Sequence, residues 1–310
     1  MTDRWNALLQ LAQALQETGY HFTTITPASH ALVNARPGNQ WADRLEDVFG
    51  WSRRFRASVM QPLLLALMRD AGILAEDGTG WRSLVRFSNM DGRLLVHSSY
   101  PTSEPDAVFL GPDTYKFADA IRMHLMVQAA PVGRAVDICC GTGAGALAIA
   151  GARPEAEVAM VDINDTALQF ARVNTALAGA DKVSAYHSDL LSAVDGAFDL
   201  IVAHPPYLVD RGTRVYRHGG GPLGAGLALS IIHTAAERLA PGGTLLLFTG
   251  VAIVRGDDPF RQEAASILPD AEFRLSYREV DPDVFGEELA HPPYDQVDRI
   301  ALVVLTATRR

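Results

Sequence analysis

The stretch Asp199–Asp210, DLIVAHPPYLVD, ends an apolar run on a histidine, two prolines and a tyrosine. Two prolines in succession make a stiff corner, because each fixes φ at about −65° and lacks a backbone N–H. The ring of His204 can accept a hydrogen bond and can take up a proton, since the ordinary pKa of histidine is about 6.5. We interpret this corner as a candidate substrate site at the end of a buried strand.

A second chemical pattern is the glycine-rich stretch Val136–Gly145, VDICCGTGAG, which follows one apolar run and opens another. Gly141 and Gly143 permit a tight turn and a close approach of the backbone to a ligand. The next strand-like run ends in Asp162, nineteen residues after Gly143, where a carboxylate can accept both hydroxyls of a ribose. Asp189 follows the run after that, in a place suited to an adenine amine. Together these places predict a nucleoside site.

The order and spacing of these motifs resemble those of class I S-adenosylmethionine-dependent methyltransferases. The matching residues are Asp137 in VDICCGTG, Asp162 in MVDIN, the SDL of Ser188–Leu190, and the AHPPYL stretch. The family usually has glycine where this chain has Cys139. A dinucleotide-dependent dehydrogenase is the main alternative, and Asp137 and the diproline corner disfavour it. A protein that binds the cofactor without transferring a methyl group is disfavoured by the intact motifs.

The corner resembles the Asn-Pro-Pro-Tyr or Asp-Pro-Pro-Tyr turn of family members that methylate planar nitrogens. The resemblance implies that the carbonyl of Pro205 accepts a hydrogen bond from the acceptor nitrogen and that Tyr207 packs on the planar group. Positioning then does most of the work of methyl transfer. We expect catalytic roles for His204, Pro205 and Tyr207, substrate contacts from His204, Pro206 and Tyr207, and no metal.

Residues Val108–Ile121, VFLGPDTYKFADAI, are similar to a segment upstream of the sheet in the glutamine methyltransferases that act on release factors. Pro112, Asp113 and Thr114 match, whereas Gly111 and Tyr115 stand where that group has Arg and Glu. The cofactor contacts that the resemblance implies are Thr114, Tyr115, Asp137, Cys139, Gly141, Gly143, Asp162, Ile163, Asp189 and Leu190.

His204 stands where that group has asparagine, so it departs from the geometry that suits a glutamine amide. Our first hypothesis is therefore a nitrogen or oxygen of a small-molecule or metabolite acceptor. A protein glutamine, on a release factor or a similar protein, and an RNA base are the alternatives. His204 is either a base or a pocket wall. Arg214, Tyr216 and Arg217 follow the corner, so we expect them to border the acceptor. A second HPPY at His291–Tyr294 is interpreted as a turn, within a long insert, Asp281–Asp298, that could cover the same pocket.

Strand-like and helix-like runs alternate from Val108 onward, which predicts a doubly wound, mostly parallel α/β sheet covered on both faces. The resemblance makes it a seven-stranded Rossmann-like methyltransferase sheet whose last strand, RIALVVLTA, is antiparallel. Ligands in such sheets bind at the carboxyl ends of the strands. Residues 108–310 are expected to form this domain.

Residues 1–107 read as a smaller helical domain, for substrate recognition or dimerisation, with helices over roughly 41–50 and 52–71. A hairpin is expected around Asp91 and Gly92, because Asp-Gly between two β-like runs is a strong turn signal. Helices followed by a two-stranded wing resemble a winged-helix unit. The oligomeric state stays open, a dimer included.

The composition sets limits on partners. The net charge of −9 does not favour nucleic acid as a partner. No apolar run reaches the length of about 18 residues that a membrane span needs, and glutamines interrupt the first helix-like run. We therefore expect a cytoplasmic protein without a membrane partner. The two cysteines, Cys139 and Cys140, are neighbours in the sequence and do not indicate a disulfide scaffold.

Overall fold

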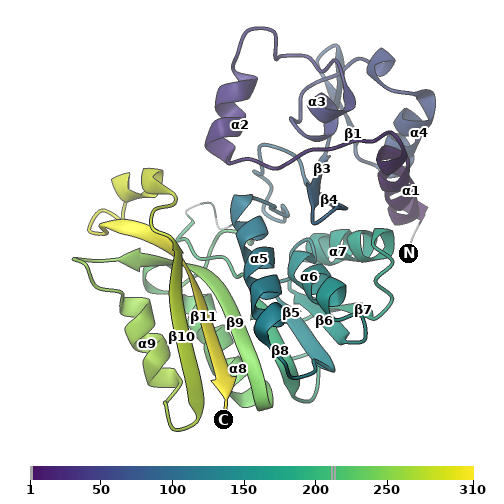
Figure 1. Cartoon of the computed structure of the whole chain (residues 1–310). Coiled ribbons are helices and arrows are strands. Elements are labelled where there is room, and N and C mark those ends of the chain that lie inside the picture. Colours follow the sequence, from purple (N-terminus) through teal and green to yellow (C-terminus); the bar gives the residue numbers. More distant parts are fainter. Residues whose placement is uncertain (1–2, 211, 213) are drawn as a thin grey trace.

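A computed structural model of the chain describes residues 3–210, 212 and 214–310. Its centre is a seven-stranded sheet (Figure 1). The strands are β5 (Arg134–Ile138), β6 (Glu157–Asp162), β7 (Val183–His187), β8 (Phe198–Ala203), β9 (Leu239–Ile253), β10 (Phe273–Asp281) and β11 (Arg299–Arg309). They lie in the order β10-β11-β9-β8-β5-β6-β7. All neighbours are parallel except β11, which runs antiparallel to β9 and β10, so the predicted mixed sheet is confirmed.

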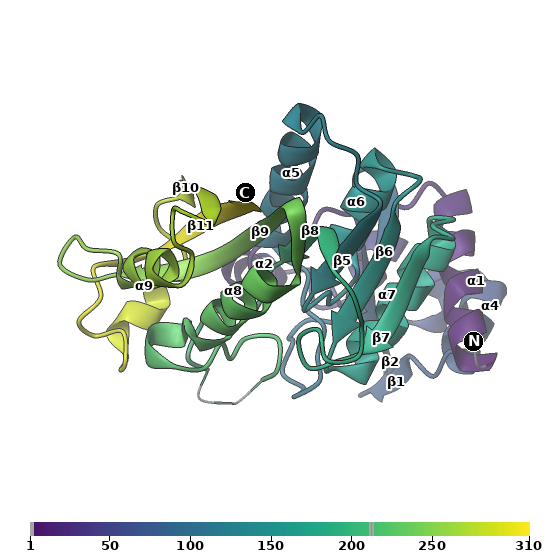
Figure 2. The same cartoon turned by 90° about the horizontal axis from the view of Figure 1, so that it is seen from below.

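Helices cover both faces of this sheet. They are α5 (Pro112–Val127), α6 (Ala144–Ala152), α7 (Asp165–Leu177), α8 (Gly226–Arg238) and α9 (Pro259–Ile267). Figure 2 shows α5 and α6 on one side of the sheet and α8 and α9 on the other. Neighbouring residues of β5 serve opposite cores, since Ala135 packs with α5 and α6 while Val136 packs with α8. Burial on both faces explains why these strands read as nearly unbroken apolar runs.

The sheet changes direction of winding at β5. From β5 the chain adds β6 and β7 on one side, and then crosses to β8 and β9 on the other. The carboxyl ends of β5, β6 and β8 therefore open into one crevice, where ligands of wound sheets bind. Cys139, Asp162 and His204 lie at or directly after these three ends.

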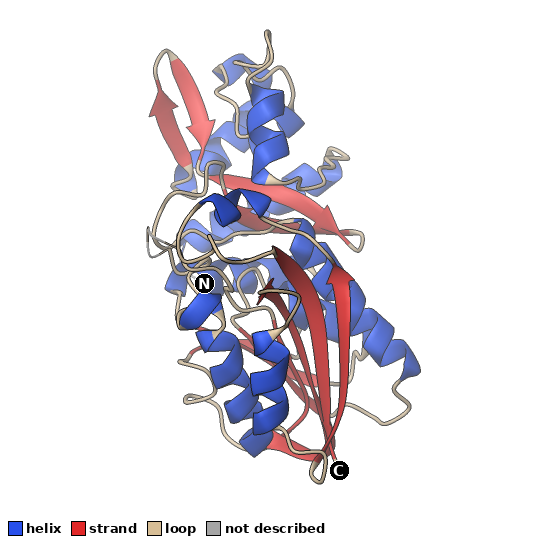
Figure 3. Cartoon of the chain, turned by 90° about the vertical axis from the view of Figure 1, so that its left-hand side faces the viewer, coloured by secondary structure: helices blue, strands red, loops and turns tan. Residues whose placement is uncertain are grey.

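The N-terminal part is helical and carries two hairpins. Its elements are α1 (Asp3–Glu17), α2 (Pro27–Asn34), α3 (Leu45–Phe49), α4 (Pro62–Asp70), β1 (Leu74–Asp77), β2 (Gly80–Ser83), β3 (Val85–Met90) and β4 (Arg93–Ser98). The hairpin of β3 and β4 turns at Asp91 and Gly92, whose φ angles of 55° and 74° explain the Asp-Gly pair. Figure 3 shows this part beyond one end of the large sheet.

Two helices expected in this part are shorter than predicted. The helix over 41–50 begins only at Leu45, because Trp41 forms a β-bridge with Arg54. The helix over 52–71 is limited to α4, since Phe55 forms a bridge with Trp81 and Pro62 occupies the first turn, where its missing N–H is tolerated. The first hairpin, β1 and β2, was not predicted.

The division at residue 107 stays a prediction, and the two sides of it share one hydrophobic core. Phe170 and Val173 of α7 belong to the same buried cluster as Leu8 of α1. Trp5 meets Phe170 edge to face, with ring centroids 6.1 Å apart. Helix α1 therefore packs directly on α7, one of the helices that cover the large sheet. No helix within the described ranges is long and apolar enough to span a membrane.

Candidate active site

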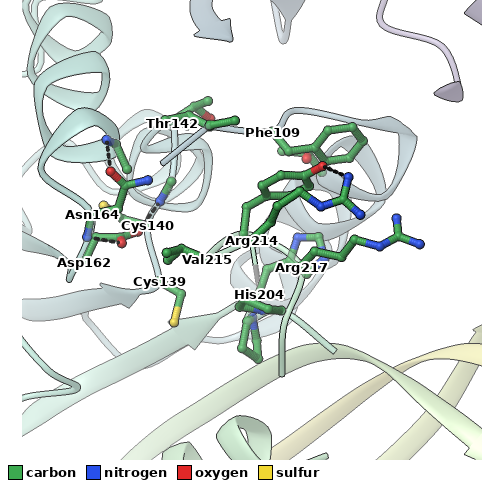
Figure 4. A pocket seen from close by; sticks show the side chains of 18 of the residues that line it. Phe109, Cys139, Cys140, Thr142, Asp162, Asn164, His204, Arg214, Val215 and Arg217 are labelled. Atoms are coloured by element: carbon green, nitrogen blue, oxygen red, sulfur yellow. Dashed lines mark hydrogen bonds between the residues drawn. The ribbon is translucent and has the colours of Figure 1, made fainter. Parts of the chain in front are cut away.

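A pocket of about 590 Å³ lies at the carboxyl ends of β5, β6 and β8 (Figure 4). Most of the predicted site residues line it. These are Thr114, Cys139, Gly141, Asp162, Ile163, Asp189, Leu190, His204, Pro205, Pro206, Tyr207, Arg214, Tyr216 and Arg217. Tyr115, Asp137 and Gly143 are not among its lining residues.

Each of those three residues has a structural role next to the pocket. The hydroxyl of Tyr115 accepts a hydrogen bond from the backbone N–H of Thr24, 3.1 Å away, so this side chain faces the N-terminal part. A Cβ on Gly143 would lie 2.9 Å from Sδ of Met160, and its φ is 78°, so only glycine fits where α6 begins. Direct contact of these residues with a cofactor stays a prediction.

Asp137 is buried beneath the glycine-rich turn. Its Oδ2 accepts the backbone N–H of Ala146 at 2.9 Å, and its Oδ1 accepts no hydrogen bond from the described residues. Burial raises the pKa of this carboxyl to about 7. Gly145 is required here, because a Cβ would lie 2.8 Å from Oδ2 of Asp137. The carboxyl thus holds the first turn of α6, and its Oδ1 is buried without a partner among the described residues.

Asp162 ties the turn after β5 to the end of β6. Its Oδ2 accepts the backbone N–H of Gly141 at 3.0 Å, and its Oδ1 accepts that of Asn164 at 2.9 Å. Burial raises the pKa of this carboxyl, and these backbone N–H groups partly oppose the rise. A carboxylate oxygen accepts more than one hydrogen bond, so both oxygens keep capacity for the hydroxyls of a ribose. Asn164 also caps α7, because its side-chain oxygen accepts the backbone N–H groups of Thr166 and Ala167.

Cys139 adopts a backbone conformation that suits the glycine expected there from the family resemblance. Its φ is 57°, in the left-handed region that residues with a Cβ rarely occupy. Burial raises the pKa of the Cys139 and Cys140 thiols well above their ordinary value, so both are neutral near pH 7. Neither thiol therefore has the character of a nucleophile.

At the other end of the pocket, the carboxylate of Asp113 contacts both His204 and Tyr207 of the diproline corner. The hydroxyl of Tyr207 donates to Oδ2 of Asp113 at 3.0 Å, and Nε2 of His204 lies 3.6 Å from the same oxygen. Burial lowers the pKa of His204, and Asp113 partly offsets this change. Asp113 was not among the predicted site residues, although its place between Pro112 and Thr114 in the matched segment was a signal.

Arg214, Tyr216 and Arg217, which were predicted to contact the acceptor, cover one side of the pocket. We call this cover, made of residues 102–109 and 214–217, the roof. Tyr216 donates its hydroxyl to the carbonyl of Thr102 at 2.9 Å and stacks on Phe109, with centroids 5.5 Å apart. The backbone N–H of Val215 donates to the carbonyl of Pro105 at 3.2 Å. Residues 102–109 and 214–217 therefore enclose the pocket together.

The two arginines of this roof are already paired with carboxylates. Arg214 binds Asp210 through its side chain, and these hydrogen bonds lower the pKa of Asp210 to about 2. Arg217 lies 3.3 Å from Asp210 and also pairs with Glu288. Both arginines line the pocket, but the positive charge of each is already paired with Asp210 or Glu288.

The second HPPY is a turn, and its tyrosine anchors the roof. The hydroxyl of Tyr294 accepts the backbone N–H of Val209 at 2.9 Å and donates to the carbonyl of Leu223 at 3.3 Å. Phe285 of the same insert lines the pocket, with its ring centroid 5.9 Å from that of Tyr207. The sequence suggested that this insert could cover the pocket, but not these individual contacts, since each depends on the close approach of segments far apart in the sequence.

Comparison with known proteins agrees with this arrangement. Residues 118–252 match the model of the family described as the methyltransferase small domain. Over 165 residues the chain is 37% identical to the release factor glutamine methyltransferase of Deinococcus radiodurans, a match that covers 50% of this chain and 55% of that protein. Over 119 residues it is 40% identical to the release factor glutamine methyltransferase of Mycolicibacterium smegmatis, covering 35% and 42%.

A third relative has another printed substrate. The chain is 33% identical over 153 residues to the ribosomal protein uL3 glutamine methyltransferase of Xanthomonas campestris, covering 46% of this chain and 47% of that protein. These matches therefore span about half the length of the curated relatives.

Solved structures support the fold. The tRNA m1G37 methyltransferase of M. jannaschii superposes with a TM-score of 0.50 at 14% identity, over 76% of this chain and 60% of that one. The structure of M. jannaschii TYW2 in complex with AdoMet gives a TM-score of 0.50 at 12% identity, over 73% and 86%. At such identities the likeness concerns the arrangement of the elements alone.

Proposed function

Because this chain contains a class I S-adenosylmethionine-dependent methyltransferase domain, we propose that it transfers a methyl group to the side-chain amide nitrogen of a protein glutamine. This proposal departs from the small-molecule acceptor that His204 favoured at the level of sequence. The reaction would take place in the cytoplasm, on a protein that presents a glutamine to the pocket.

The residues around the glycine-rich turn fit S-adenosylmethionine. Asp162 has carboxylate capacity for the ribose hydroxyls, and the buried Asp137 holds the first turn of α6 beneath the glycine-rich turn. Gly141 has no atom within 4 Å of the position where a Cβ would stand, so its face of the turn is open. When bound, this cofactor supplies an electrophilic methyl group on a sulfonium, and no metal is needed.

The observation that carries the proposal is the diproline corner at the end of β8, in the same pocket as the nucleoside-binding residues. The carbonyl of Pro205 accepts no hydrogen bond from the described residues. Tyr207 is held by Asp113, so its ring is fixed as one wall for a planar group. The corner can therefore orient an amide nitrogen toward the methyl donor, and orientation of this kind accounts for much of a transfer reaction.

The protein acceptor is supported by the relatives. All three relatives described above are named as glutamine methyltransferases, of release factors or of ribosomal protein uL3. The upstream Pro112-Asp113-Thr114 segment, which the sequence likened to that group, supplies Asp113 to the corner. These observations outweigh the substitution of asparagine by His204.

A small-molecule nitrogen is the second candidate, and the roof of the pocket favours it. Tyr216 and Phe109 stack over the crevice, and Val215 is bonded to Pro105. A peptide loop would have to displace or thread these contacts, whereas a metabolite would fit beneath them.

Incubation of the full chain with isotopically labelled S-adenosylmethionine tests the proposal. Release factor, ribosomal protein uL3, total RNA and a metabolite extract serve as parallel acceptors. We expect label on a glutamine of one of the proteins, located by mass spectrometry of the digested product. Label confined to the metabolite extract or to RNA would overturn the protein acceptor, and no label in any arm would overturn methyl transfer.

A further inference from the structure

Asp113 contacts both His204 and Tyr207, and the diproline corner alone does not explain why a carboxylate lies there. One oxygen of its carboxylate, Oδ2, receives the hydroxyl of Tyr207 at 3.0 Å and faces Nε2 of His204 at 3.6 Å. The distance to His204 is that of an ion pair and longer than a hydrogen bond, and catalytic contacts of this kind often shorten when substrate binds. The side chains of His204 and Asp113 are 14% and 13% exposed, so the pair is largely shielded from water.

The local sequence holds this carboxylate in place. Asp113 lies in the first turn of α5, where the helix dipole favours a negative charge. Its other oxygen, Oδ1, accepts the backbone N–H of Thr114 at 3.1 Å. A Cβ on Gly111 would lie 2.9 Å from Oδ1 and 2.4 Å from the ring of Phe109. The glycine that departs from the related segment therefore makes room for Asp113.

The chemistry of the pair decides which nitrogen of His204 carries the proton. An ionised carboxylate only accepts hydrogen bonds, so the ring nitrogen that faces it must be the donor in the neutral imidazole. That nitrogen is Nε2, and Nδ1 is left as an acceptor. Among the described residues, the polar contact of the ring is the one of Nε2 with Asp113 at 3.6 Å, and the ring lines the pocket.

We propose that Asp113 is a positioning residue that holds His204 in the Nε2-protonated tautomer, so that Nδ1 and the carbonyl of Pro205 act as two acceptors for the incoming nitrogen. The inference rests on the proposed function and names the acceptor class more closely. Two acceptors require a nitrogen that carries two hydrogens, such as a primary amide. A hydroxyl would leave one acceptor unsatisfied, which is costly in a shielded pocket.

The same arrangement accounts for the proton that is lost. The acceptor nitrogen forms a bond to the methyl carbon, and the electron pair of the broken carbon–sulfur bond stays on sulfur. One N–H proton of the nitrogen passes to Nδ1 of His204, whose imidazolium then faces the carboxylate of Asp113. The positive charge that leaves sulfur is therefore found on His204, and water takes the proton before the next cycle.

Nuclear magnetic resonance of the ring nitrogens tests the tautomer without any acceptor. The full chain is labelled with ¹⁵N-histidine, and the signals of His204 are assigned by their loss in His204→Asn. At neutral pH we expect Nε2 protonated and Nδ1 unprotonated in the wild type. Asp113→Asn and Asp113→Ala should increase the Nδ1-protonated form, whereas Tyr207→Phe should leave the tautomer unchanged.

A proton on Nδ1 in the wild type, or an unchanged tautomer in both Asp113 variants, would overturn the inference. Circular dichroism and binding of S-adenosylmethionine confirm that each variant is folded. Since these measurements need no acceptor, their failure leaves the proposed function standing. Absence of methyl transfer to any acceptor would instead overturn the proposed function and leave the tautomer result intact.

The pH dependence of kcat supplies a second readout once an acceptor is known. The titratable groups that face His204 among the described residues are Asp113 and Tyr207, while Phe117 and Phe248 pack on its ring without charge. Asp113→Asn should lower kcat by about 10–100-fold and move the acidic limb to lower pH, since Asp113 raises the pKa of His204. In the His204→Asn background the same change should cost less than about twofold; an equal loss in both backgrounds would contradict the coupling.

Discussion

The carboxyl groups of Asp162, Asp113 and Asp137 differ in how completely their oxygens are hydrogen-bonded. Asp162 and Asp113 each receive hydrogen bonds at both oxygens or face a donor, whereas Asp137 is buried with one oxygen unpaired among the described residues. Ionising a buried carboxyl without a partner is costly, so the pKa of Asp137 rises to about 7. Asp137, the first residue of the cofactor motif in the family resemblance, therefore lowers the free energy of unfolding of the protein when no cofactor is bound.

Replacement of Asp137 by asparagine should stabilise the protein above neutral pH. In the wild type the unfolded carboxyl ionises near its ordinary pKa, while the folded one stays protonated up to about pH 7. Wild-type stability contributed by this group should therefore fall as the pH rises from about 4 to about 7. The asparagine side chain keeps an oxygen for the N–H of Ala146 and removes the ionisation, so the advantage of the variant should grow over that range and vanish below it.

Urea unfolding of wild type and Asp137→Asn at pH 4, 6 and 8 measures this difference. Asp181→Asn, at an exposed carboxylate, is the matched control and should show no such trend. A difference between wild type and Asp137→Asn that does not change with pH would contradict the assignment.

The elements that carry the site were more accessible to prediction than those that enclose it. The strands β5, β6 and β8 were expected from apolar runs that end on chemically distinctive residues. The edge strand β10 was missed, because only its first residue, Phe273, is fully buried and its other positions are polar or partly exposed. The individual contacts of Phe285 with Tyr207 and of Tyr294 with Val209 were not predicted, because they join segments distant in the sequence.

Removal of the Tyr294 hydroxyl should loosen the roof without affecting the cofactor end. This hydroxyl bonds Val209 and Leu223, on both sides of the roof residues. In Tyr294→Phe we expect kcat/KM for the acceptor to fall by about 5–20-fold, corresponding to about 1–2 kcal/mol for the loss of the two hydrogen bonds of this hydroxyl. The affinity for S-adenosylmethionine should change less than about twofold.

Tyr277→Phe is the control for this prediction, because its hydroxyl donates to Asp258, outside the pocket residues. If Tyr294→Phe and Tyr277→Phe alter kcat/KM for the acceptor equally, Tyr294 has no special part in the site.

On the scale of the whole molecule, one buried side chain connects the N-terminal hairpin with the glycine-rich turn. Asn174 of α7 accepts the backbone N–H of Val96 at 2.7 Å and donates to the carbonyls of Val96 and Thr142, at 3.1 and 2.9 Å. The N-terminal part was predicted as a separate unit from a change of pattern, and a pattern along the chain does not reveal such a tertiary bond. The three bonds, together with the shared core of α1 and α7, predict that both parts unfold together.

Asn174→Ala should therefore destabilise the whole chain by about 3 kcal/mol or more, because three buried backbone groups lose their partner. Its affinity for S-adenosylmethionine should also fall, since Thr142 belongs to the turn that lines the pocket. Asn39→Ala removes one partly buried bond, to Val33, and should cost less than about 1 kcal/mol. Chemical unfolding followed by fluorescence and circular dichroism measures both; separate transitions for the two parts would contradict the coupling.

Calorimetric titration of the full chain with S-adenosylmethionine tests the central claim, that the carboxyl edge of the sheet binds this cofactor through Asp162. Wild type should bind at one site, and Asp162→Ala should bind about 10–100-fold more weakly, because a charged hydrogen-bonding partner of the ribose is lost. Asp165→Ala, three residues along the chain and outside the pocket, should bind as the wild type does. Equal affinity of all three proteins, or no binding by the wild type, would contradict the account.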